Sequence, residues 1–276
     1  MNEISAIANR SMLSAYLGTT LTREVDGLIA NVDHVFGLWT NQGFEDAEHN
    51  LPHLWQGGLG LTESGKYLDS APQAADLRTK YQAHVAAVLR LAEFADADTR
   101  AASIVRLETS IARTFAPDSD ASDVFKQNNL WKRQDFNRKA PGIDWDAYFQ
   151  SAGLAKQLNF LVWQPSAVTG VSALAASENL EVWKDYLRFH LIEQYAKVLP
   201  KAVRAEDFNF YGKVLSGAAE SPDRPEEAVD ATNGALGEAV GQLYAQHYFS
   251  AKAKQRTLAI ARNLITAYRS RIANLT

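Results

Sequence analysis

Apolar residues recur between residues 81 and 115 with the spacing of a buried helix face. They form two runs separated by a short, Asp-rich link, Glu93–Thr99. The i, i+3, i+4 and i+7 spacing places the apolar side chains on one side of a helix, which must then be covered. We therefore predict an antiparallel helical hairpin, with Asp96 or Asp98 capping the second helix. The two runs are Tyr81, Val85, Val88, Leu89, Ala92 and Ile104, Leu107, Ile111, Phe115.

Residues 117–143 break this pattern, because proline, glycine, aspartate and asparagine cluster there in turn-forming combinations. The stretch is a candidate sub-boundary within the chain. A short helix is predicted over Asp144–Gln150, with Gly153 just past its end. The apolar run Leu158–Trp163 fits a buried extended segment and a buried piece of helix equally well.

From Ser177 onward the pattern is almost continuously helical. Pro225 suits the first turn of one helix, and a last helix is predicted from about Ser250. Its apolar stripe is still running when the sequence stops at Thr276, so we expect the chain to belong to a longer protein. We expect the near end of the stripe to lie in the core of this chain and the far end to face another lobe. The stripe consists of Leu258, Ala261, Ile265, Tyr268 and Ile272.

These patterns predict an all-α fold, a multi-helix lobe with at most one short extended segment. The chain has 276 residues, a formal net charge of −4 and no cysteine. This composition is globular, and it excludes disulfides, thiol catalysis and Cys-ligated zinc. No apolar run is long enough for a transmembrane segment, and the net acidity argues against a nucleic-acid partner.

Two histidines, His49 and His53, have the i, i+4 spacing of a zinc-binding helix. Asn50 stands where a general-base glutamate would be, and Pro52 blocks the helix on which the spacing relies. We interpret the pair as loop histidines. His84 lies beside an apolar helix face, which favours a structural role over a ligand role.

Two Glu-x-x-x-Asp patterns, Glu181/Asp185 and Glu226/Asp230, resemble a motif that supplies one zinc ligand and an acid that supports the ligands, but the sequence has no His-Glu-x-x-His. We interpret both as solvated helix faces. The glycine cluster Trp55–Gly60 lacks the spacing of a phosphate-binding loop and has no clear strand before it, so it predicts a turn. The last 26 residues hold six basic residues and no acid, which we interpret as a solvated face complementing an acidic body. These observations leave no catalytic or metal-binding residue to assign, and the substrate-binding residues are unknown.

Several aromatic motifs follow one another in a specific order: Trp145-x-x-Tyr148-Phe149, Trp183-x-x-Tyr186-Leu187-Arg188-Phe189, Phe208-x-Phe210-Tyr211 and Leu236-Gly237-x-Ala239-Val240-Gly241. Upstream, Gly58-Leu59-Gly60-Leu61, Tyr81-x-x-His84 and Leu107-Glu108-x-x-Ile111-Ala112 precede them. This order resembles the non-catalytic N-terminal region of the neprilysin and endothelin-converting-enzyme family of zinc metalloendopeptidases, which includes bacterial oligopeptidase O.

The resemblance implies that residues 1–276 form the helical, substrate-restricting region of such an enzyme, truncated at both ends. Its partner would be the enzyme's own C-terminal catalytic domain, its substrates short peptides and its cofactor zinc, all outside this chain, which alone would be inactive. The absence of cysteine fits the bacterial branch, and family analogy favours the periplasm or cell envelope. The alternative is an independent helical protein-interaction module, and a small metalloenzyme using His49 and His53 is a third, weaker reading.

Overall fold

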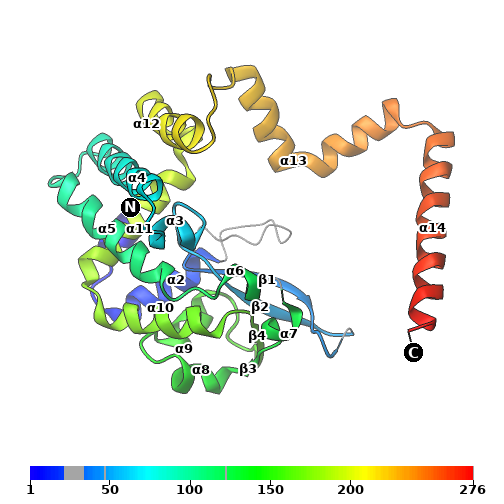
Figure 1. Ribbon diagram of the computed structural model, residues 1–276, viewed down its shortest axis with the longest axis horizontal. Coiled ribbons are helices and arrows are strands. Elements are labelled where there is room, and N and C mark those ends of the chain that lie inside the picture. Colours follow the sequence, from blue (N-terminus) through cyan, green and yellow to red (C-terminus); the bar gives the residue numbers. More distant parts are fainter. Residues whose placement is uncertain (22–33, 47, 122, 276) are drawn as a thin grey trace. The chain divides into compact units, whose positions relative to one another are not determined.

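The protein divides into two compact units. In the computed structural model, which describes residues 1–21, 34–46, 48–121 and 123–275, unit 1 is Met1–Ala218 and unit 2 is Ala219–Thr276. Both units are rich in helix (Figure 1).

Unit 1 is built around helices that the apolar spacing predicts. The predicted hairpin is confirmed as α4 (Pro72–Leu91) and α5 (Ala97–Ala112), which pack on each other and on α11 (Leu180–Gln194). Asp96 is the N-cap residue of α5, but its backbone is left-handed (φ 55°) and its side chain makes no capping hydrogen bond. The predicted short helix is α9 (Trp145–Ser151), where Asp144 accepts from the Ala147 N–H and Gly153 has φ 73°.

The other helices of unit 1 are mostly short. They are α1 (Asn2–Ser5), α2 (Arg10–Thr20), α3 (Ser64–Leu68), α6 (Asp118–Ala121), α7 (Val124–Gln127), α8 (Arg133–Lys139), α10 (Pro165–Ser177), the 3₁₀ turn η1 (Ala196–Val198), α12 (Lys201–Asp207) and the π-helix η2 (Phe208–Leu215).

The all-α prediction is wrong, because unit 1 contains a small mixed sheet. Its strand order is β1-β2-β4-β3, with β1 and β2 antiparallel, β2 and β4 parallel, and β3 antiparallel to β4. Leu158–Trp163 does contain the expected extended segment, β4. The strands are β1 (Phe36–Gln42), β2 (Asn50–Gln56), β3 (Leu130–Lys132) and β4 (Asn159–Val162).

Pro52 explains why the sequence pattern does not predict β2. A proline has no N–H for a strand ladder, so it argues against a central strand. Here Pro52 lies opposite Thr40 of β1, and the pairing of β2 with β4 starts one residue later, at His53. The proline therefore sits where β2 has a strand on one side only.

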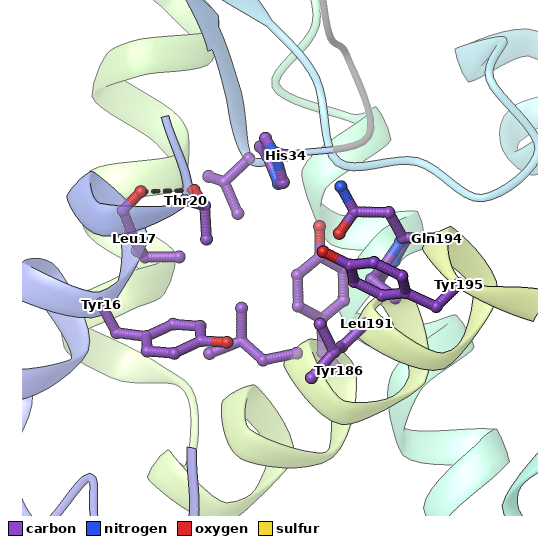
Figure 2. A pocket seen from close by; sticks show the side chains of 11 residues that line it. Tyr16, Leu17, Thr20, His34, Tyr186, Leu191, Gln194 and Tyr195 are labelled. Carbon is purple, nitrogen blue, oxygen red and sulfur yellow. Dashed lines mark hydrogen bonds between the residues drawn. The ribbon is translucent and has the colours of Figure 1, made fainter. Parts of the chain in front are cut away.

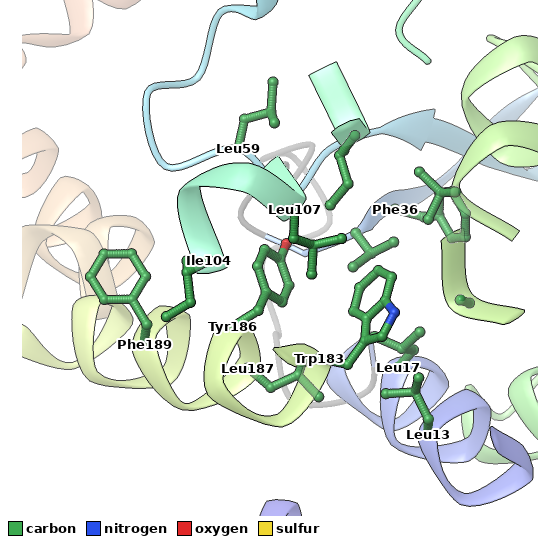
Figure 3. Packing of buried hydrophobic residues seen from close by; sticks show 14 of the residues in the cluster. Leu13, Leu17, Phe36, Leu59, Ile104, Leu107, Trp183, Tyr186, Leu187 and Phe189 are labelled. Atoms are coloured by element: carbon green, nitrogen blue, oxygen red, sulfur yellow. The ribbon is translucent and has the colours of Figure 1, made fainter. Parts of the chain in front are cut away.

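The core of unit 1 joins the sheet to the helices. Its inner sheet face contributes Phe36 of β1 and Leu54 of β2, which are both buried. Figure 3 shows Trp183 and Leu187 of α11 in the same cluster as Leu17 of α2. The sheet thus shares one hydrophobic core with the longest helices of unit 1.

Unit 2 consists of two long helices, α13 (Arg224–Tyr248) and α14 (Ala251–Ala273), and neither contains a buried residue. Pro225 lies in the first turn of α13 and Ser250 caps α14, as the sequence predicts. Within unit 2 the Leu258 side chain is 45% exposed, so the two helices of this unit do not cover it. Within the described ranges, no helix has the length and apolar content needed to span a membrane.

Candidate functional site

The two histidines with zinc-like spacing do not converge. His49 is exposed and its Nδ1 lies 2.7 Å from the Asp46 carboxylate. His53 is buried in β2, so the interpretation of the pair as loop histidines is wrong for His53. The imidazole of His53 is engaged at both nitrogens: Nδ1 accepts from the Trp163 indole at 2.9 Å, and Nε2 lies 3.1 Å from the Gln42 carbonyl. Burial lowers the pKa of His53, so the ring is held neutral as part of the sheet.

His53 belongs to an aromatic cluster on the outer face of the sheet. Trp163 lies 4.4 Å from Trp55 and 4.8 Å from Trp39, measured between ring centroids. Trp39 also stacks on His53 at 5.3 Å. The surroundings of His53 are those of a packed core histidine, so the metal reading of the pair has no support from its geometry.

One of the two Glu-x-x-x-Asp patterns is not the solvated face that we predict from its sequence. Asp185 is buried and accepts from Arg100 Nη1 at 2.6 and 2.7 Å and from Arg188 at 2.9 Å. It therefore ties α11 to α5 through a buried ion pair. The second pattern, Glu226 and Asp230, is exposed on α13 as predicted.

The glycine cluster forms a turn, as predicted, although a strand (β2) does directly precede it. Gly58 has φ 89°, and its carbonyl accepts from the Tyr186 hydroxyl at 2.9 Å. A Cβ on Gly60 would lie 1.9 Å from the Tyr81 hydroxyl. The glycines are thus required by the close approach of two tyrosines, and the turn makes no phosphate cradle.

The most unusual group of side chains in unit 1 surrounds Glu108 of α5, which is fully buried. Tyr67 donates to one carboxylate oxygen at 2.7 Å and Tyr81 donates to the other at 3.0 Å. His190 Nε2 lies 2.7 Å from Glu108 Oε1. Burial, and then the Glu108 charge, raise the pKa of both tyrosines well above the usual value, which keeps them protonated as donors.

A second buried histidine adjoins this group. His84 of α4 places Nδ1 3.0 Å from Glu206 and Nε2 3.2 Å from Glu193. These two carboxylates outweigh the opposing effect of burial and raise the pKa of His84 to about 9. The expectation of a structural histidine beside an apolar helix face is confirmed. We call His84, Glu108, His190, Glu193 and Glu206 the buried ionic cluster.

The π-helix η2 completes the surroundings of the buried ionic cluster. Phe210 stacks on His84 with 4.8 Å between ring centroids, and Tyr211 meets the same ring edge-on at 5.4 Å. Two consecutive residues of η2 therefore contact the ring of His84. Burial and the charge of Glu193 raise the pKa of Tyr211.

Two cavities flank the buried ionic cluster. The first, shown in Figure 2, has a volume of about 40 Å³ and lies among Tyr16, Thr20, Tyr186, His190 and Gln194. A water needs roughly 10–15 Å³ by this measure, so the cavity has room for a few waters and not for a peptide.

The second cavity has a volume of about 200 Å³ and is lined in part by His190, Glu193, Asp207 and Tyr211. Burial and the nearby Glu193 raise the pKa of Asp207. Ligand pockets typically measure about 300–1,000 Å³, so this cavity is below the usual size for a bound substrate.

The buried ionic cluster does not fit a zinc ion. Within residues 1–21, 34–46, 48–121 and 123–275, no group of three His, Asp or Glu side chains could hold a metal. Both nitrogens of His84 face carboxylates, so neither offers a free lone pair to a metal. The arrangement joins helices that are far apart in the sequence.

The protein resembles peptidases in all three comparisons. The family model of peptidase family M13 matches residues 1–276. An endothelin-converting enzyme homolog of Locusta migratoria is 22% identical over 259 residues, which cover 89% of this chain and 35% of that protein. A neutral endopeptidase of Lactobacillus helveticus is 26% identical over 172 residues, covering 59% of this chain and 26% of that protein.

Solved structures agree with the sequence matches. A zinc metalloprotease of Mycobacterium tuberculosis, in complex with an inhibitor, superposes with a TM-score of 0.86 and 32% identity, over 97% of this chain and 40% of that one. A PepO of Lactobacillus rhamnosis shares the fold, with a TM-score of 0.76 and 18% identity. The chain spans less than half the length of these relatives. These relatives come from both animals and bacteria, so they do not decide whether the chain belongs to the bacterial branch of the family.

Proposed function

Because the chain belongs to peptidase family M13, we propose that it forms the helical, non-catalytic region of a zinc metalloendopeptidase that cleaves short peptides. In this proposal the helices close over a catalytic region and limit the size of the peptides that enter. The observation that supports it best is the match of the family model to all 276 residues, together with the superposition on two-fifths of a zinc metalloprotease.

Unit 2 supports the proposal because its large apolar side chains are exposed. The two helices of the unit do not cover them. Eleven of these side chains are exposed along α13 and α14, and such a large apolar surface usually marks an interface. They are Val229, Leu236, Leu243, Tyr244, Tyr248, Leu258, Ile260, Leu264, Ile265, Tyr268 and Ile272. We infer that the rest of the peptidase covers this face. An independent interaction module would need a separate partner for it.

The size-limiting role can be tested with a fusion of residues 1–276 to the part of the Mycobacterium tuberculosis protease that the superposition leaves uncovered. We expect the fusion to cleave a short quenched peptide and to spare the same sequence placed in a loop of a folded protein. The uncovered part alone should lose this preference. A fusion that cleaves both substrates, or neither, would contradict the proposal.

Removing apolar side chains at the end of α14 should change association more than stability. Tyr268 and Ile272 are 63% and 61% exposed, so Tyr268→Ser with Ile272→Ser should change the free energy of unfolding by less than about 0.5 kcal/mol. Sedimentation should show weaker self-association, because an exposed apolar patch is lost.

The matched control for this pair is Gln255→Ser with Asn263→Ser, which changes two exposed polar residues of the same helix. It should leave both stability and sedimentation unchanged. If the Tyr268/Ile272 variant instead lost several kcal/mol of stability, the end of α14 would already be covered within this chain.

A further inference from the structure

His84 holds together three elements that are far apart in the sequence. It projects from α4, while its two carboxylate partners come from α11 (Glu193) and α12 (Glu206). A neutral imidazole has only one N–H. Two ring nitrogens facing two carboxylates therefore require the doubly protonated ring, and loss of one proton turns one contact into repulsion between lone pairs.

The contacts of His84 with the two carboxylates do not cost the same to break. The Glu193 side chain is 11% exposed and the Glu206 side chain is 24% exposed. Glu193 belongs to α11, which packs on α5 and α4 and supplies much of the core. Glu206 lies on the seven-residue helix α12, whose only buried residue is Val203. The Glu206 contact is the one that can open at the lower cost.

Release of Glu206 would affect the π-helix as well. α12 runs directly into η2, and η2 has only one fully buried residue, Phe210, whose ring stacks on His84. A π-helix is rare, because its i→i+5 hydrogen bonding departs from the geometry of the α-helix. The ring of His84 is therefore one of the points that fix the stretch 201–215 to the rest of unit 1, beside the contact of Phe210 with Tyr81 at 5.4 Å and the burial of Val203.

We propose that His84 is a proton-dependent latch: its imidazolium clamps α12 and η2 onto α4 and α11, and loss of the proton frees them. The stretch that the latch controls is the last one before Ala219, where unit 2 begins. The latch would thus set how firmly the connection to unit 2 is anchored. This inference does not rest on the proposed function.

The direction of the pH effect follows from the raised pKa. Because the pKa of His84 is about 9 in the folded protein and 6.5 in its ordinary state, the hold is complete below pH 6.5. It weakens as the pH rises from 6.5 and is lost above about 9. Opening linked to one proton changes up to about tenfold per pH unit inside this window.

Other charged groups around His84 must be considered too. Asp207 of α12 faces both His84 and Glu193, and Lys197 of η1 acts on Asp207. Tyr211 of η2 meets the ring edge-on, and Tyr81 stacks beside it on α4. The pKa of both tyrosines is raised well above its usual value, so neither tyrosine loses its proton within the window.

The test is backbone amide hydrogen exchange of residues 201–215 between pH 6 and pH 10, corrected for the intrinsic exchange rate at each pH. We expect protection to fall steadily from pH 6.5 to about 9 and then to level off, while α9 (145–151) stays constant. The ring titration of His84, followed by NMR, should have its midpoint near pH 9.

Two variants separate the latch from a general loss of structure. His84→Gln should give low protection of 201–215 at every pH, and Glu206→Gln should lower the midpoint of His84 and the protection at pH 7. Glu220→Gln, an exposed matched change outside the cluster, should behave as the parent chain. A midpoint near 6.5, or protection of 201–215 that stays level up to pH 9 in the parent chain, would overturn the proposal.

Discussion

Replacing Glu108 with alanine is expected to lower the free energy of unfolding by about 3–5 kcal/mol, because it removes the shared partner of several buried, hydrogen-bonded groups. The change would leave the hydroxyls of Tyr67 and Tyr81 and the ring of His190 buried without their acceptor. Glu108→Gln should recover part of the loss, because the amide oxygen still accepts a hydrogen bond. Denaturant unfolding measures both values.

Glu181→Ala is the control for Glu108, because Glu181 is an exposed acid whose partner is Lys184. It should cost less than about 1 kcal/mol, because the Glu181 side chain is 62% exposed and solvent screens its charge. If Glu108→Ala also cost less than that, the carboxylate would not contribute to holding α3, α4, α5 and α11 together.

Trp183→Ala is expected to cost about 3–5 kcal/mol, the usual range for removing a large aromatic side chain from a core. Trp183 is fully buried on α11, and its indole N–H donates to the Leu174 carbonyl at 3.3 Å. The measurement is the denaturant midpoint together with its slope, which shows whether the variant still unfolds in one step.

Leu258→Ala provides the comparison for Trp183, since Leu258 lies on α14 and is 45% exposed. We expect it to change stability by less than about 0.5 kcal/mol. A cost at Leu258 as large as that at Trp183 would mean that unit 2 has a core of its own.

The sequence predicts the elements whose signals are local. The α4–α5 hairpin follows from the apolar spacing, and the predicted short helix near Asp144 and the first-turn Pro225 both agree with the structure. The sequence patterns do not predict the sheet, because its strands are short and one contains Pro52. Its pairings also join residues that are far apart, such as Leu54 and Val162. No local pattern reports such a contact.

The sequence does not predict the buried ionic cluster for the same reason. Glu108 meets partners 27, 41 and 82 residues away, and the two carboxylates of His84 are 109 and 122 residues away. The sequence does signal that His84 lies beside an apolar face. It does not signal that acids from two other helices neutralise its charge, since Glu193 and Glu206 look like ordinary surface residues.

The most direct test of the non-catalytic assignment is the zinc content of purified residues 1–276 after dialysis against zinc, read beside their cleavage of a quenched oligopeptide. We expect far less than one zinc per chain and no cleavage, since neither His49 with His53 nor the buried ionic cluster forms a ligand set. Zinc near one per chain, lost in the double variant His49→Ala, His53→Ala and accompanied by cleavage, would contradict the account.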